Sequence, residues 1–208
     1  MAAAIERIYE AALDLVTFKG YDEIDADQIA ARAGVPRADF DRLFASKEEC
    51  ALALFDSFMG DCIEYVRAAY RGEPQWPDSL RAAAYALADW LDAHPREVRF
   101  GGLGILWVSD LAQVRREQAL EHFARMADGG RAGAPDPALV PDSAAAGVVG
   151  AVAAALARRA DQRDEAPRGS ARSFVPQLMY LAVLPYRGEE AAARELSIPP
   201  PAPADPQP

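Results

Sequence analysis

A short stretch near the start of the chain holds charged side chains of both signs that could recognise another charged molecule. The charged residues are Arg37, Asp39, Asp41, Arg42 and Lys47, and Ala38 lies among them on the same candidate surface. Arginine donates paired hydrogen bonds to phosphate or to guanine, and a carboxylate can accept a hydrogen bond from the cytosine amine. A lysine at a helix N-terminus is well placed to hold a phosphate. The residue types therefore indicate a candidate nucleic-acid interface.

The same charges also have a purely local interpretation. On a helix, Arg37 and Asp41 are four residues apart and Asp39 and Arg42 are three apart, so each couple can form an ion pair across one turn. The two interpretations are compatible, because such pairs would hold both guanidinium groups in fixed orientations for bases or phosphates.

Three helices must position these side chains. The apolar stripe of the first helix stops at Gly20, a residue suited to a helix C-cap. Asp25 and Gln28 have the spacing of a capping box, and the helix that they begin ends at Gly34. A third helix is expected over Pro36–Phe44. Two short helices joined by a glycine turn have the outline of a helix-turn-helix, whose second helix is the recognition helix.

The rest of the chain also has apolar residues at helical spacing, and no stretch shows the alternation of a strand, so we predict an all-α fold. The expected domains are a helix-turn-helix domain at 1–48, a larger helical bundle at 49–198 and a Pro-rich extended tail at 199–208. The expected helices of the bundle are a long one from 47 to about 72, one from 77 to before 95, one or two over 95–127 with a break at the glycines near 101–104, one from 142 to about 157, and one from 170 to about 186. Loops are expected at 128–141 and 161–169.

Composition alone argues against a nucleic-acid partner. The chain has 208 residues with 22 basic and 32 acidic side chains, a net charge of −10. Residues 1–58 alone contain six basic and twelve acidic residues, a balance of −6. Nucleic-acid-binding proteins usually carry the opposite charge.

The two cysteines and the apolar segments indicate a cytoplasmic protein. Cys50 and Cys62 fall on one predicted helix, roughly 18 Å apart, and so cannot form a disulfide with each other. No signal peptide or membrane-spanning segment is expected, because the longest uncharged stretch is shorter than the ~20 residues that a bilayer requires.

One run of residues carries a resemblance to a known family. Ile29-Ala30-Ala31-Arg32-Ala33-Gly34-Val35-Pro36, the later Phe44, and the start Ser46-Lys47-Glu48-Glu49 resemble the N-terminal domain of the TetR family of bacterial transcriptional regulators. The resemblance covers about residues 5–58. It implies an all-helical homodimer whose recognition helices enter successive major grooves of double-stranded, palindromic operator DNA. It also implies a C-terminal domain that binds a small-molecule effector and forms the dimer, and hence a ligand-responsive regulator, expected to be a repressor.

Three carboxylates depart from the family pattern. The family places hydroxyl groups near phosphates where this sequence has Asp25, Asp39 and Asp41. A carboxylate is repelled by a phosphate. The alternative is therefore a TetR-like dimer that binds a small molecule or a protein and has weak or lost operator binding.

The family comparison also suggests an effector pocket and a dimer interface. The candidate pocket residues are Tyr85, Trp90, Phe100, Trp107, Phe123, Met126 and Tyr180. Aromatic residues at helical spacing are equally expected in a hydrophobic core. The small-residue helix near 143–158 and the helix near 171–186 are the candidate dimer interface.

Signatures of catalysis and of metal binding are missing from the sequence. The glycines at 101, 102 and 104 follow no strand, so they form no dinucleotide-binding loop. His94 and His122 lack the spacing of metal ligands, and neither cysteine lies in a metal or nucleophile motif. We therefore expect no enzyme activity, no metal and no cofactor.

Overall fold

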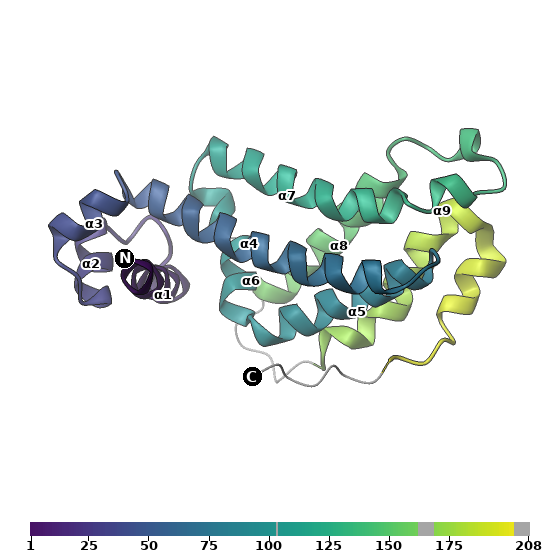
Figure 1. The fold of residues 1–208 in the computed structure, drawn as a ribbon, viewed down its shortest axis with the longest axis horizontal. Coiled ribbons are helices and arrows are strands. Elements are labelled where there is room, and N and C mark those ends of the chain that lie inside the picture. The colour runs from purple at the N-terminus through teal and green to yellow at the C-terminus, as the bar shows by residue number, and fades with distance from the viewer. Residues whose placement is uncertain (103, 162–168, 202–208) are drawn as a thin grey trace. The chain divides into compact units, whose positions relative to one another are not determined.

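The computed structural model describes residues 1–102, 104–161 and 169–201, and within these ranges the chain is helical without strands, as the sequence predicts (Figure 1). The α-helices are α1 (Ala2–Lys19), α2 (Ala26–Ala33), α3 (Arg37–Leu43), α4 (Lys47–Gly72), α5 (Asp78–Ala93), α6 (Pro95–Gly102), α7 (Asp110–Asp128), α8 (Ala144–Asp161) and α9 (Val175–Glu195). Short 3-10 turns are η1 (Gly104–Trp107), η2 (Arg131–Gly133), η3 (Pro137–Leu139) and η4 (Ala171–Phe174).

Local chemistry sets the helix ends in the first fifty residues. The Asp25 carboxylate accepts a hydrogen bond from the Gln28 N–H at 2.8 Å and thereby caps α2. Gly34 ends that helix with a left-handed φ of 64°, a conformation that disfavours residues with a side chain. At the start of α4, the Ser46 hydroxyl accepts from the Glu49 N–H at 3.0 Å. These caps confirm the predicted helix starts and the turn.

The later helices follow the prediction with one difference, which concerns the last helix. The glycines near 101–104 do interrupt the chain, since α6 ends at Gly102 and η1 begins at Gly104. The last helix continues to Glu195 instead of ending near Tyr186, and its direction changes at Gly188, whose φ is 78°. Most of the loop expected at 161–169 and most of the predicted tail lie outside the described residues.

The described residues form two compact units. The N-terminal unit contains residues 1–61, 94–118 and 156–161, so that α6, η1 and the first part of α7 are grouped with the helix-turn-helix elements. Its largest fully buried side chains are Ile8, Leu13, Ile29, Phe40, Phe55 and Ile105. Helix α1 packs against both α2 and α6 and so connects the helix-turn-helix with α6.

The C-terminal unit contains residues 62–93, 119–155 and 169–201 and has two apolar clusters. The α5–α9 cluster consists of Tyr85, Ala88, Ala171, Val175, Met179, Val183 and Ala192. The α4–α5–α7 cluster has Cys62, Val66 and Ala83 at its centre, with Tyr70, Leu87, Trp90, Phe123 and Met126 packed against them.

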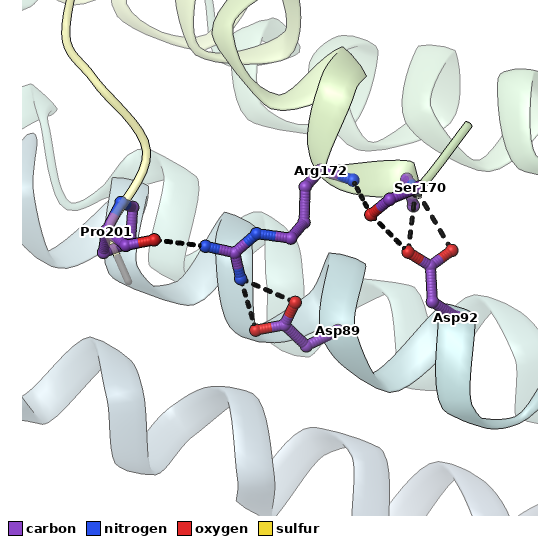
Figure 2. A network of polar contacts seen from close by, with 6 residues as sticks. Asp89, Asp92, Ser170, Arg172 and Pro201 are labelled. Atoms are coloured by element: carbon purple, nitrogen blue, oxygen red, sulfur yellow. Dashed lines mark hydrogen bonds and ion pairs between the residues drawn. The ribbon is translucent and has the colours of Figure 1, made fainter. Parts of the chain in front are cut away.

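Polar contacts fix the start of the last helical segment on α5 (Figure 2). The Asp92 carboxylate accepts hydrogen bonds from the Ser170 hydroxyl at 2.5 Å and the Ala171 N–H at 2.9 Å. Arg172 donates to both Asp89 carboxylate oxygens at 2.6 Å and to the Pro201 carbonyl at 2.6 Å. Its guanidinium also lies 4.8 Å from the centre of the Tyr85 ring. The segment that precedes α9 and the residues that follow it are thereby joined to α5.

Among the residues that the structure describes, no helix is both long enough and apolar enough to cross a lipid bilayer.

Candidate nucleic-acid interface

Helix α3 is held by two buried aromatic rings and turns a polar face to solvent. Phe40 is fully buried, and its ring centre lies 5.6 Å from that of Phe44, which in turn lies 6.0 Å from the ring of Tyr9. Arg37, Ala38, Asp41 and Arg42 are all exposed. The predicted recognition helix therefore presents these four residues together on one accessible face, whereas Asp39 is partly buried and Lys47 lies on α4.

The Arg37 guanidinium is already paired with two carboxylates. Its Nε donates to Asp41 at 2.8 Å, as the spacing predicts, and a terminal nitrogen donates to Asp27 at 2.7 Å. These bonds, the one to Asp41 foremost, raise the pKa of Arg37. Asp27 belongs to α2, so the second ion pair links the two helices of the helix-turn-helix. Sequence reasoning missed Asp27 because a contact over ten residues depends on how the helices pack.

Arg42 is paired in the same manner with Asp39, its partner three residues earlier. Both arginine–carboxylate couples within α3 were predicted, and both are confirmed. A phosphate or base that contacts either arginine must replace a carboxylate or share the guanidinium with it. The face thus combines suitable donors with acceptors that compete for them.

Lys47 has an internal role that the sequence did not reveal. Its ammonium donates to the backbone carbonyls of Tyr21 at 3.0 Å and Ile24 at 2.8 Å, and lies 4.3 Å from the centre of the Tyr21 ring. Lys47 therefore ties the loop between α1 and α2 to the first residue of α4. An ammonium has three N–H groups, so one remains for a phosphate after these two bonds.

The remaining unusual carboxylate, Asp25, is the N-cap of α2. Each of the three acids found where the resemblance implies hydroxyl groups thus has a partner within the chain: a backbone N–H for Asp25, and an arginine for Asp39 and Asp41. Their partners explain how the acids are accommodated in the fold. They still bring negative charge to a surface that would face phosphates.

A second set of ion pairs connects the helix-turn-helix with α6. Arg96 of α6 donates to Asp14 at 2.5 Å and to Glu10 at 3.0 Å, both on α1. Asp14 also accepts from Arg32 of α2 at 2.7 Å. These hydrogen bonds, the one from Arg32 foremost, hold the pKa of Asp14 below its usual value. One carboxylate thereby joins three helices of the N-terminal unit.

The seven predicted effector-pocket residues lie in separate places. Trp90, Phe123 and Met126 pack around the α4–α5–α7 cluster, whereas Tyr85 is in the α5–α9 cluster with Tyr180 packed against it. Phe100 and Trp107 belong to the N-terminal unit, where Phe100 is buried and the Trp107 side chain is 75% exposed. The structure therefore brings three of the residues together between α4, α5 and α7 and two others between α5 and α9. No group of three or more potential metal ligands occurs among the described residues.

Comparisons with known proteins agree with the class of fold that the helix-turn-helix defines. Residues 8–54 match the family described as "Bacterial regulatory proteins, tetR family". No curated protein matches the chain. The sequence resemblance to the TetR family is confirmed, and the matched segment contains α2, α3 and the start of α4.

Solved structures extend the likeness to the whole fold. The fatty acid degradation regulator FadR from Bacillus halodurans matches with a TM-score of 0.69 at 17% identity, over 88% of this chain and 94% of that one. FadR from Bacillus subtilis, solved in complex with stearoyl-CoA, gives 0.66 at 16% identity, over 87% and 97%. A tetR-family regulatory protein from Rhodococcus RHA1 gives 0.70 at 18% identity, over 89% and 97%. The chain has the fold of TetR-family transcriptional regulators.

Proposed function

We propose that this protein is a ligand-responsive transcriptional repressor that binds a palindromic operator in double-stranded DNA as a homodimer, and that it acts in the cytoplasm. The observation that carries the proposal is the exposed face of α3, with two arginines on a helix of seven residues. Such a helix is about 10 Å long, and the major groove is about 12 Å wide. The match of residues 8–54 to the tetR family supports the same use of this face.

The ion pairs on α3 set how DNA would be contacted. Arg37 and Arg42 would release their carboxylate partners and donate hydrogen bonds to phosphate oxygens or to guanine instead. Asp39 could then accept a hydrogen bond from a cytosine amine. Lys47 would contact a phosphate with its remaining N–H. The neighbouring carboxylates would then favour sites at which base contacts compensate for repulsion, so specific operators would be preferred over random DNA.

The proposed dimer interface is the surface of α8 and of the part of α9 that precedes Gly188. Helix α8 exposes a face of small residues, among them Ala146, Gly147, Gly150, Ala151 and Ala154. Helix α9 exposes Leu181 and Leu184, which are 47% and 37% accessible. Small residues allow close approach of helix backbones, and exposed leucines supply apolar area for burial. A second copy of the chain would cover both helices.

The proposed effector site lies at the α4–α5–α7 cluster, where Trp90, Phe123 and Met126 meet. Flexible methionine and flat aromatic side chains suit an apolar ligand. FadR from Bacillus subtilis has been solved with stearoyl-CoA, so a fatty acyl-CoA is the first compound to test on this chain.

A second candidate function follows from the same carboxylates. If repulsion by Asp25, Asp39 and Asp41 outweighs the arginine contacts, the protein would be a TetR-like dimer that binds a small molecule or a protein partner without reading DNA. Replacement of Asp41 by Asn or Tyr distinguishes the two functions. A large gain in affinity for any DNA would favour the second function, whereas weaker binding to one operator would place Asp41 in the reading surface.

DNA binding itself is tested by titrating labelled fragments from the promoter region of the protein's own gene and following fluorescence anisotropy. Wild-type protein should show saturable binding at 50 mM salt, and Arg37→Gln should weaken it roughly tenfold or more. Arg194→Gln is the matched control, because Arg194 is also an exposed arginine paired with an acid four residues away. No saturable binding, or equal affinities for the two variants, would contradict the proposal.

A further inference from the structure

Two arginines from different helices converge on one nitrogen of His122. In the C-terminal unit, a terminal nitrogen of Arg67 on α4 lies 3.1 Å from His122 Nδ1, and a terminal nitrogen of Arg125 on α7 lies 3.0 Å from the same atom. Both guanidinium groups can only donate, so His122 Nδ1 must be the acceptor and carry no proton. Sequence spacing did not reveal this group, because Arg67 is 55 residues away from His122.

The arrangement has more donors than acceptors. An unprotonated imidazole nitrogen has one lone pair in the ring plane, so it accepts one well-aligned hydrogen bond and leaves the second guanidinium N–H without a good acceptor there. The acids that face the group are Glu64 on α4, paired with Arg67, and Glu121 on α7, whose carboxylate is 3.7 Å from Arg125. Both glutamates are about two-thirds exposed, at 66% and 68%, so either can yield to another anion.

This polar group borders the α4–α5–α7 cluster. Arg67 follows Val66, His122 precedes Phe123 and Arg125 precedes Met126, and each of these apolar neighbours belongs to the cluster or packs against it. Neighbouring residues on a helix point about 100° apart, so the cationic donors lie on faces of α4 and α7 that adjoin the faces packed in the cluster. A molecule that touches both would need an anionic group next to an apolar part.

We propose that Arg67, His122 and Arg125 form a binding site for the phosphate or carboxylate group of an anionic small molecule whose apolar part packs at the α4–α5–α7 cluster. The guanidinium N–H groups would donate to the anion's oxygens, and the anion would take the place of Glu64 or Glu121. The identification of this molecule as the effector rests on the proposed function. The anion site itself does not.

The pKa of His122 reports directly whether an anion occupies the proposed site. Burial, Arg125 and Arg67 lower its pKa, and Glu121 and Glu64 offset part of that decrease. An anion bound between the arginines would stabilise the protonated imidazole and raise the pKa again. An opposite charge within 4–6 Å shifts a pKa by roughly one unit or more.

The first experiment follows the ring-proton NMR signals of the two histidines in the full-length protein between pH 5 and 8. Sulfate is the first probe, because its charge is constant over this range, and sodium chloride at equal ionic strength is the reference. We expect sulfate to raise the pKa of His122 by roughly one unit and to leave His94 unchanged. Arg67→Gln and Arg125→Gln should each remove the shift, whereas Arg71→Gln, which alters an exposed arginine on the same helix, should keep it. Arg67→Lys retains the charge and should keep part of the shift, which separates loss of the anion site from misfolding.

Octanoate and octyl phosphate at pH 7 then distinguish the two kinds of anion, with octanol as the uncharged comparison. Tighter binding of either anion than of octanol, lost in Arg67→Gln, supports the site. The absence of any effect of the three anions on His122, or an effect that persists when Arg67 and Arg125 are both replaced, would overturn it. DNA affinity measured without anion tests the proposed function separately, so a failure of one is distinguishable from a failure of the other.

Discussion

The ion pair between Arg81 and Glu195 gives the sharpest stability prediction. Glu195 is only 4% exposed, and its two carboxylate oxygens accept from Arg81 Nε and a terminal nitrogen, both at 2.8 Å. The pair joins α5 to the part of α9 beyond the Gly188 break. Glu195→Ala would leave a largely buried guanidinium with only its pair to Asp78 at 2.6 Å.

The expected cost follows from the burial of the pair. Removing one partner of a buried ion pair destabilises a protein by about 3–5 kcal/mol, and the lower end applies here because Asp78 still holds Arg81. At about 2–4 °C per kcal/mol for a chain of this size, the melting temperature should fall by roughly 6–12 °C. Thermal and urea unfolding followed by circular dichroism at 222 nm would measure both quantities.

Glu190→Ala is the matched control for that experiment. Glu190 lies on the same helical segment and pairs with Arg194, but its side chain is 91% exposed. An exposed pair contributes at most about 1 kcal/mol, so this variant should melt within a few degrees of wild type. Equal melting temperatures for the two variants would refute the reasoning that burial makes the Arg81–Glu195 pair important.

Three further predictions concern the N-terminal unit and the buried thiols. Asp25→Ala removes the N-cap of α2 and should lower the free energy of unfolding by about 1 kcal/mol in urea titrations, whereas an unchanged value would show that the cap is dispensable. The pKa of Asp14 is lowered in the folded state, so the stability that this carboxylate supplies is present above its ordinary pKa of 3.8 and is lost as the pH falls below it; Asp14→Asn should therefore approach wild-type stability between pH 5 and 3, and a constant gap would contradict this. Burial raises the pKa of the Cys50 and Cys62 thiols to about 12 each, so a thiol reagent at pH 8 should label them only after unfolding, and rapid labelling of the native protein would be inconsistent with their burial.

Sequence reasoning was most successful where short-range chemistry decides the outcome. The cap at Asp25, the turn at Gly34 and the pairs within α3 all join residues at most four positions apart, so helical geometry alone specifies them. The break at the glycines near 101–104 was likewise predicted from the low helix propensity of glycine. The all-helical class followed from the apolar spacing along the chain.

Contacts between distant segments were not predictable in the same way. The second partner of Arg37, the carbonyl partners of Lys47 and the Arg96 link to α1 depend on how helices pack, which apolar spacing does not specify. The aromatic residues show the same limit. Both Trp107 and Phe123 are large apolar residues that sequence alone would place in a core, yet Trp107 is largely exposed whereas Phe123 packs against a core cluster. The family resemblance suggested that seven residues line one pocket, but the packing of the helices places these residues in different clusters and in both units.

The salt dependence of DNA affinity shows whether the face of α3 binds DNA through Arg37 and Arg42. For wild-type protein, the logarithm of the binding constant should fall linearly with the logarithm of salt concentration between 50 and 200 mM. Arg37→Gln should reduce the magnitude of that slope by about 0.9 if Arg37 contacts a phosphate. A slope near zero, or a slope and an affinity that are both identical in wild type, Arg37→Gln and Arg42→Gln, would contradict DNA binding by this face.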